Sequence, residues 1–163
     1  MRKVFLVSAL LCGMSVVAGA QKVTGKISCS KPSVNEMAGG GASEGIMFQR
    51  SNCTWPTPFI VAGSKPGRTF DAAIGEMSGS KARIHGYSTS VMDNGDTTVV
   101  RYEGLSEMKK DGTGGGRGTW KFVRGTGKFR GISGGGTYKS VLAADGSGSA
   151  DVSGHYSVPK AKK

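Results

Sequence analysis

Glycine is unusually frequent in this chain, and this feature limits the available folds more than any other. The sequence holds 28 glycines among its 163 residues, without the Gly-X-Y period of collagen. Apolar residues are spread along the whole chain, so the composition does not indicate wholesale disorder. Glycine at this density, with only 5 prolines, is typical of many short strands joined by tight turns.

The stretch from Thr119 to Lys139, "TWKFVRGTGKFRGISGGGTYK", resembles two catalytic patterns but fits neither. A phosphate-binding P-loop needs Ser or Thr after its Gly-Lys pair, and Phe129 follows Lys128 here. A nucleophile elbow needs Gly-x-Ser-x-Gly between a strand and a helix, whereas only glycines follow Ser133. We therefore interpret the stretch as part of a sheet.

This stretch predicts a hairpin. Alternation places Trp120 and Phe122 on one face of the first strand, and the return strand is expected to begin at Phe129. Glycine adopts positive φ without steric cost. The expected structural turn consists of Gly125, Thr126, Gly127 and Lys128.

Other segments show the two-residue period of half-buried strands. The Asn94-Gly95 pair is a strong hairpin signal between two of them. The predicted strands are Val23–Cys29, Ile46–Cys53, Phe59–Ala62, Phe70–Glu76, Arg83–Met92, Thr97–Tyr102 and Ala150–Val158, with loops at Lys31–Ser43 and Lys109–Gly116. The sequence thus predicts an all-β domain, a single antiparallel barrel of about eight strands. A two-sheet sandwich remains the alternative.

The N-terminus has the three parts of a secretory signal peptide. Arg2 and Lys3 precede an apolar run, and Ala18-Gly19-Ala20 offers a cleavage site before Gln21. We expect residues 1–20 to be removed between Ala20 and Gln21, residues 21–158 to form the barrel, and 159–163 a basic tail. The expected location is periplasmic or extracellular, with no transmembrane segment after cleavage.

Removal of the signal would leave Cys29 and Cys53, an even pair in an oxidising compartment. We expect a disulfide between them, with two free thiols as the alternative. With only two histidines in the chain, no zinc-type ligand cluster is expected. The mature charge would be +9, from 22 − 2 basic minus 11 acidic residues.

The motif Gly125-Thr126-Gly127-Lys128-Phe129 resembles the hairpin of the allene oxide cyclase and dirigent superfamily, especially its small secreted bacterial members. Arg124 departs from the pattern, because dirigent proteins usually have another glycine there. The resemblance implies an eight-stranded antiparallel barrel of calycin-like shape with an apolar cavity. The matched motif is a turn, so the resemblance carries no catalytic residue.

The function we favour is a non-catalytic binding barrel for a small apolar or aromatic ligand, without cofactor or metal. Aromatic residues at strand positions could line its cavity, or could simply fill a core. The candidate ligand-binding residues are Tyr102, Trp120, Phe122, Phe129, Tyr138 and Tyr156.

Two other functions stay open. The first is an isomerase or cyclase like those of the resembled family, for which Arg101, Glu103 and His155 are the polar candidates on strands. The second is weak binding to anionic envelope surfaces through the positive charge. Specific nucleic-acid binding is not expected, because the stacked aromatic motif of RNA-binding sheets is missing from the sequence.

Overall fold

The computed structural model describes residues 19–40 and 44–159, and this part of the chain is built from strands. The predicted signal segment, apart from its last two residues, and residues 160–163 of the basic tail lie outside the described residues. The elements are β1 (Gln21–Cys29), β2 (Val34–Ala38), β3 (Ile46–Thr57), β4 (Pro66–Ser78), β5 (Lys81–Met92), β6 (Thr97–Met108), β7 (Gly114–Gly125), the short 3-10 helix η1 (Gly127–Phe129), β8 (Ser133–Leu142) and β9 (Gly148–Ser157).

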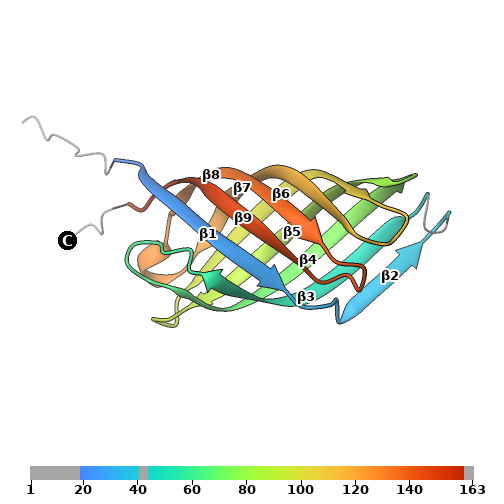
Figure 1. Cartoon of the computed structure of the whole chain (residues 1–163). Helices are drawn as coiled ribbons and strands as arrows, with labels where there is room; N and C mark the ends of the chain where they lie inside the picture. Colours follow the sequence, from blue (N-terminus) through green and yellow to red (C-terminus); the bar gives the residue numbers. More distant parts are fainter. Residues whose placement is uncertain (1–18, 41–43, 160–163) are drawn as a thin grey trace, which may run out of the picture.

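Eight of these strands close into an antiparallel barrel, which confirms the predicted fold (Figure 1). Each strand from β3 to β9 pairs with the next, and β9 pairs with β1 along the full length of β1. A short pairing of β1 with β3 completes the ring. The sandwich alternative is thereby excluded, because a sandwich would leave this seam unpaired.

The disulfide Cys29–Cys53 lies on the seam, as predicted from the even number of cysteines. Cys29 and Cys53 are directly opposite in the β1–β3 pairing, which has only three aligned residue pairs and an irregularity between Lys26 and Ser28. The covalent bond therefore joins the two strands whose pairing is the shortest in the barrel.

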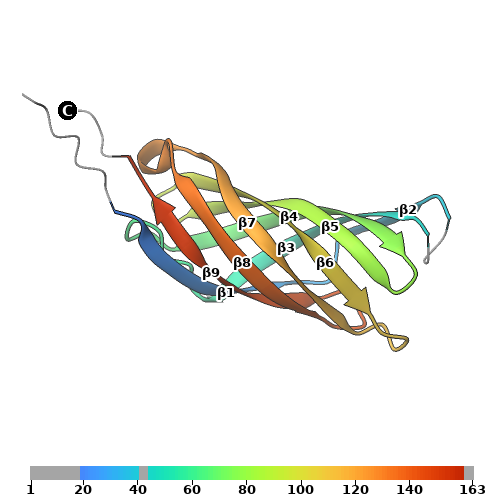
Figure 2. The same ribbon diagram turned by 90° about the horizontal axis from the view of Figure 1, so that it is seen from above.

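The ninth strand, β2, extends beyond the barrel. It pairs only with β3, where the sequence predicted a loop over residues 31–43. Figure 2 shows β2 at the end of the barrel opposite to the start of β1 and the end of β9. The loop prediction was wrong here because the β3 edge offers Val34–Ala38 a complete antiparallel partner, which outweighs their weak pattern.

Three further boundaries differ from the sequence prediction. Phe59–Ala62 is a loop with a single bridge between Val61 and Ser64, because neighbouring prolines cannot donate to a ladder. Strand β7 begins at Gly114, inside the predicted loop 109–116. Phe129 belongs to η1, so the return strand begins at Ser133 instead.

One end of the barrel is closed by a packed core. The loop after β3 inserts Phe59 and Val61, and η1 contributes Phe129, which is fully buried. The Phe59 ring contacts Trp120 edge-on at 5.4 Å between centroids. The closing cluster consists of Val23, Phe59, Val61, Met92, Trp120, Phe122, Phe129, Ile132 and Tyr156.

Glycines facing the interior explain how large rings fit inside so small a barrel. A Cβ on Gly154 would lie 2.6 Å from Cζ2 of Trp120, and one on Gly86 would lie 2.6 Å from Oη of Tyr102. A Cβ on Gly118 would meet the Tyr138 ring at 2.7 Å. Glycines and aromatic rings thus pack together, with Tyr102 and Tyr138 each over a glycine of the neighbouring strand and Trp120 over a glycine two strands away.

Candidate functional site

A polar site lies inside the barrel, on the wall formed by β4, β5 and β6. Asp71 faces inward from β4, and the hydroxyl of Tyr102 donates to its Oδ2 at 2.8 Å. Tyr138 of β8 packs edge-on against Tyr102, with 5.9 Å between ring centroids. Ser88 of β5 is directly opposite Asp71 in the strand register. We call these four residues the interior polar site.

Burial governs the electrostatics of this site. It raises the pKa of Asp71 from 3.8 to about 6, and the hydrogen bond from Tyr102 opposes that rise. Burial and the negative charge of Asp71 hold the pKa of Tyr102 well above its ordinary value. Burial, followed by the Asp71 charge, likewise raises the pKa of Tyr138. Near neutral pH the site therefore holds one carboxylate beside two protonated phenols.

The hydrogen-bonding capacity of the site is only partly used. Ser88 Oγ is buried and has no hydrogen-bond partner among the described residues. By contrast, the next polar layer toward the closed end is satisfied, since Trp55 Nε1 donates to Thr69 Oγ1 at 2.9 Å and Thr69 shares a 2.8 Å bond with Ser90. Buried polar groups in proteins are nearly always paired, so an unpaired hydroxyl beside a carboxylate distinguishes this position.

The burial of the inward-facing residues changes along the barrel axis. Around Trp120 and Phe122 the inward residues are buried, whereas Ser106, Ser140 and Leu142, toward the β2 end, are only half-buried. The interior polar site lies between these two halves. We call the β2 end the open end of the barrel.

The structure divides the six predicted ligand-binding aromatics into two groups. Trp120, Phe122, Phe129 and Tyr156 belong to the closing core. The Trp120 indole donates to the Thr137 and Ser153 carbonyls, and the Tyr156 hydroxyl donates to Gln21 Oε1 while accepting the Ala62 amide. Tyr102 and Tyr138 are instead half-buried and belong to the interior polar site.

The predicted turn residues form the connection between β7 and β8. Gly127 has positive φ, at +48°, but Gly125 ends β7 in an extended conformation. Thr126 Oγ1 accepts the Thr97 amide, and Asp96 accepts the Lys128 amide, so this connection is bonded to the β5–β6 turn. Gln21, at the predicted cleavage site, is the first residue of β1.

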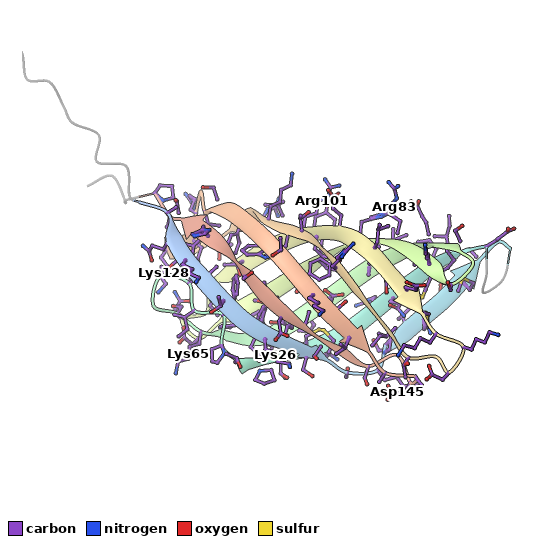
Figure 3. The ribbon with its side chains drawn as sticks, turned by 45° about the horizontal axis from the view of Figure 1, so that its top comes forward. Lys26, Lys65, Arg83, Arg101, Lys128 and Asp145 are labelled. Carbon is purple, nitrogen blue, oxygen red and sulfur yellow. A yellow bond between two sulfur atoms is a disulfide. The ribbon has the colours of Figure 1, made fainter. Side chains whose placement is uncertain are left out.

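The polar candidates proposed for catalysis lie on the outer surface. Arg101 and Glu103 form an exposed ion pair at 3.3 Å, and His155 is exposed on β9. Figure 3 shows Arg83 and Arg101 projecting from the outside of the barrel. Ser133, from the elbow-like pattern, is exposed at the start of β8.

The sequence did not indicate Asp71 or Ser88 as site residues, because the apolar pattern of β4 predicts that the opposite face of the strand is the inward one. Phe70 and Ile74 alternate with Asp71, Ala73 and Gly75, and the usual rule would bury the two large apolar residues. In the structure Phe70 is 47% exposed and Asp71 faces the interior. The available signal was that Asp71 shares its face with alanine and glycine, residues that leave room in a narrow barrel.

Comparison with known proteins provides no relative. No protein family model matches the chain, and no curated protein is significantly similar to it. Among the described residues, no helix is long and apolar enough to cross a membrane. No group of three or more potential metal-ligating side chains gathers in that part of the chain.

Proposed function

We propose that this protein is an exported, non-catalytic binding barrel that takes a small ligand with an apolar or aromatic body into the open half of its interior. The observation that carries the proposal is the interior polar site, where Asp71 and Ser88 keep unused hydrogen-bonding capacity within a barrel. Ligand sites combine apolar walls with a few convergent polar groups of this kind. The resemblance to the allene oxide cyclase and dirigent superfamily implies an apolar cavity within the barrel.

Dye titration tests this function. We expect a neutral apolar naphthylamine dye to bind the folded protein with saturation and defined stoichiometry, and to lose most of its affinity in Tyr138→Ala. Tyr87→Ala serves as the matched control, because Tyr87 lies on the outer face of β5 and is 50% exposed. Failure of the folded protein to bind the dye, together with native mass spectra free of any retained ligand, would overturn the proposal.

An isomerase or cyclase remains the second candidate, and the Asp71–Tyr102 pair favours it. A carboxyl group with a pKa of about 6 beside a tyrosine is suited to general acid–base catalysis near neutral pH. Incubation with a ligand retained in native preparations separates the two functions, because a binding protein returns the ligand unchanged and an isomerase converts it to a product of equal mass but different chromatographic retention.

Binding to anionic surfaces is favoured by a different observation, the like-charged pairs on the outer face. Arg117 is directly opposite Lys139, and Arg101 is directly opposite Lys121, although such pairs destabilise a sheet. A polyanion would add to the negative charge that Glu103 and Asp151 already place beside Arg101 and Lys139. Co-sedimentation with anionic lipid vesicles tests this function, which requires binding at low salt that is lost at high salt.

A further inference from the structure

Asp71 is a buried carboxylate without a cationic partner. The two ion pairs within the described residues, Lys26–Asp151 and Arg101–Glu103, both lie on the surface. A buried charge without a counterion is costly, and proteins usually pair it. The one hydrogen bond that Asp71 accepts from a side chain comes from a neutral phenol.

Every strand packed against Asp71 presents an uncharged group to it. The neighbour on β3 is Ser51 and the neighbour on β5 is Ser88, each directly opposite in register. Tyr102 reaches it from β6, and the Asp71 charge also raises the pKa of Tyr138 of β8. The basic residues of β6 and β7 nearest in register, Arg101 and Lys121, occupy exposed outward positions.

We propose that the interior polar site binds the protonated amine of a small organic cation, with Asp71 as its counterion and Ser88 as a second acceptor. The inference rests on the proposed function and names the ligand class for that same site. An ammonium group carries three N–H donors, which can use the free Asp71 oxygen and the unpaired Ser88 hydroxyl together. The Tyr102 and Tyr138 rings add faces that attract cations.

The alternatives fit these residues less well. An anionic ligand would lie against the Asp71 carboxylate, and a neutral ligand would leave that charge unpaired. The net positive charge of the chain does not prevent cation binding, because the outward basic side chains are solvated and are screened over about 10 Å at moderate salt.

The experiment compares three probes of the same shape, benzylammonium, benzyl alcohol and benzoate, by isothermal titration calorimetry on the full-length mature protein. At about pH 7.5 we expect the cation to bind at least about ten-fold more tightly than the alcohol. Lowering the pH to about 5 should weaken cation binding by about ten-fold, because only about one-tenth of Asp71 then remains ionised. The affinity for the alcohol should stay unchanged.

Two variants isolate the residues. Asp71→Asn keeps an acceptor for Tyr102 and should abolish the preference for the cation, while the alcohol still binds. Ser88→Ala should weaken the binding of the cation several-fold. It should leave the thermal midpoint of the protein unchanged, because the hydroxyl that it removes has no hydrogen-bond partner. Asp151→Asn, an exposed carboxylate on β9, is the control and should change neither affinity.

The outcomes separate this inference from the proposed function. Equal binding of cation and alcohol, or a preference for benzoate, would overturn the inference and leave the binding barrel standing. Binding of none of the three probes, with no binding of the neutral dye, would overturn both. A cation preference that persists in Asp71→Asn would also overturn the inference, since the counterion would then lie elsewhere.

Discussion

Asp71 links the chemistry of the interior to the stability of the fold. Its folded-state pKa is raised to about 6 from 3.8, so between these values the folded protein binds more protons than the unfolded chain. Stability should therefore fall as pH rises from about 4 to about 6, and then stay level. The full effect is at most about 3 kcal/mol, from a shift of roughly two units.

Asp71→Asn should remove this slope. We expect the variant to be more stable than wild type at about pH 8, by about 1–3 kcal/mol, and nearly equal to it at about pH 4. Urea unfolding across this range measures the difference. A variant that loses stability at pH 8 would show that the ionised carboxylate is favourable in the fold, contrary to its burial.

The glycines beneath the aromatic rings allow a second prediction, on the stability of variants with a single substitution. Gly86→Ala would place a methyl group 2.6 Å from Oη of Tyr102 and 2.5 Å from the Ala72 carbonyl, so we expect it to cost about 1–3 kcal/mol. In Gly67→Ala the methyl group would meet only the Val91 carbonyl, at 3.1 Å, and the change should stay within about 0.5 kcal/mol. If the thermal midpoint falls by a comparable amount in both variants, the close packing of aromatic rings against glycine is not what makes Gly86 necessary.

At the scale of strands, the seam between β1 and β3 depends on its disulfide. The two cysteines are 24 residues apart, and closing such a loop is worth roughly 3.5 kcal/mol on the chain-entropy model. The double variant Cys29→Ser, Cys53→Ser should lose about 2–4 kcal/mol, with amide exchange rising first in β1 and β3. The β6–β7 pairing, far from the seam, is the internal control and should keep its protection.

Reduction of this single bridge should increase the intact mass of the protein by about two hydrogens. Exchange that rises equally in all strands would mean that the barrel opens as one unit, and that the seam has no special role.

Strand pattern and turn chemistry allowed most of the barrel to be predicted. The Asn94-Gly95 turn and the alternation of Trp120 and Phe122 were interpreted correctly, because both signals are local. Strand β2 was missed because its own pattern is weak, although its partner β3 is the next strand along the chain. The insertion of Phe59 into the core was missed because its contact with Trp120 joins residues distant in sequence. The interior polar site was predicted only through Tyr102 and Tyr138, because the β4 pattern is inverted.

That inversion has a physical cause at the level of the sheet. Several large apolar residues of the wall from β3 to β5 face outward, including Phe48, Phe70 and Tyr87, which are 39%, 47% and 50% exposed. At the level of Asp71 the interior already contains the Tyr102 and Tyr138 rings, and the directly opposite positions on β3 and β5 are the short residues Ser51 and Ser88. Nearer the β2 end, Met47 and Ile84 face inward over Gly75. A sequence pattern shows that two faces differ, but it does not show which of them is crowded.

The two ends of the barrel differ in packing, and this asymmetry bears on how a ligand of the proposed function would reach the interior polar site. The closing core, with Phe59, Val61 and Phe129, blocks one approach. Near the other end, Leu142 of β8 faces inward and is half-buried, while its neighbour Val141 faces outward and is 59% exposed. A bulky residue at position 142 should therefore obstruct the approach to the site, and the same residue at 141 should not.

We expect Leu142→Trp to slow ligand association at least about ten-fold in stopped-flow measurements with the dye, and Val141→Trp to leave it unchanged. Leu142 is half-buried near the end of β8, opposite Gly148, so we expect the variant to keep its thermal midpoint within a few degrees. Because the two substitutions add the same ring to adjacent residues of one strand, hydrophobicity and local strand propensity are matched. Unchanged association in Leu142→Trp would show that ligands do not pass the β2 end. The approach would then have to lie through the closing core, and loosening that core by Phe59→Ala should accelerate association instead.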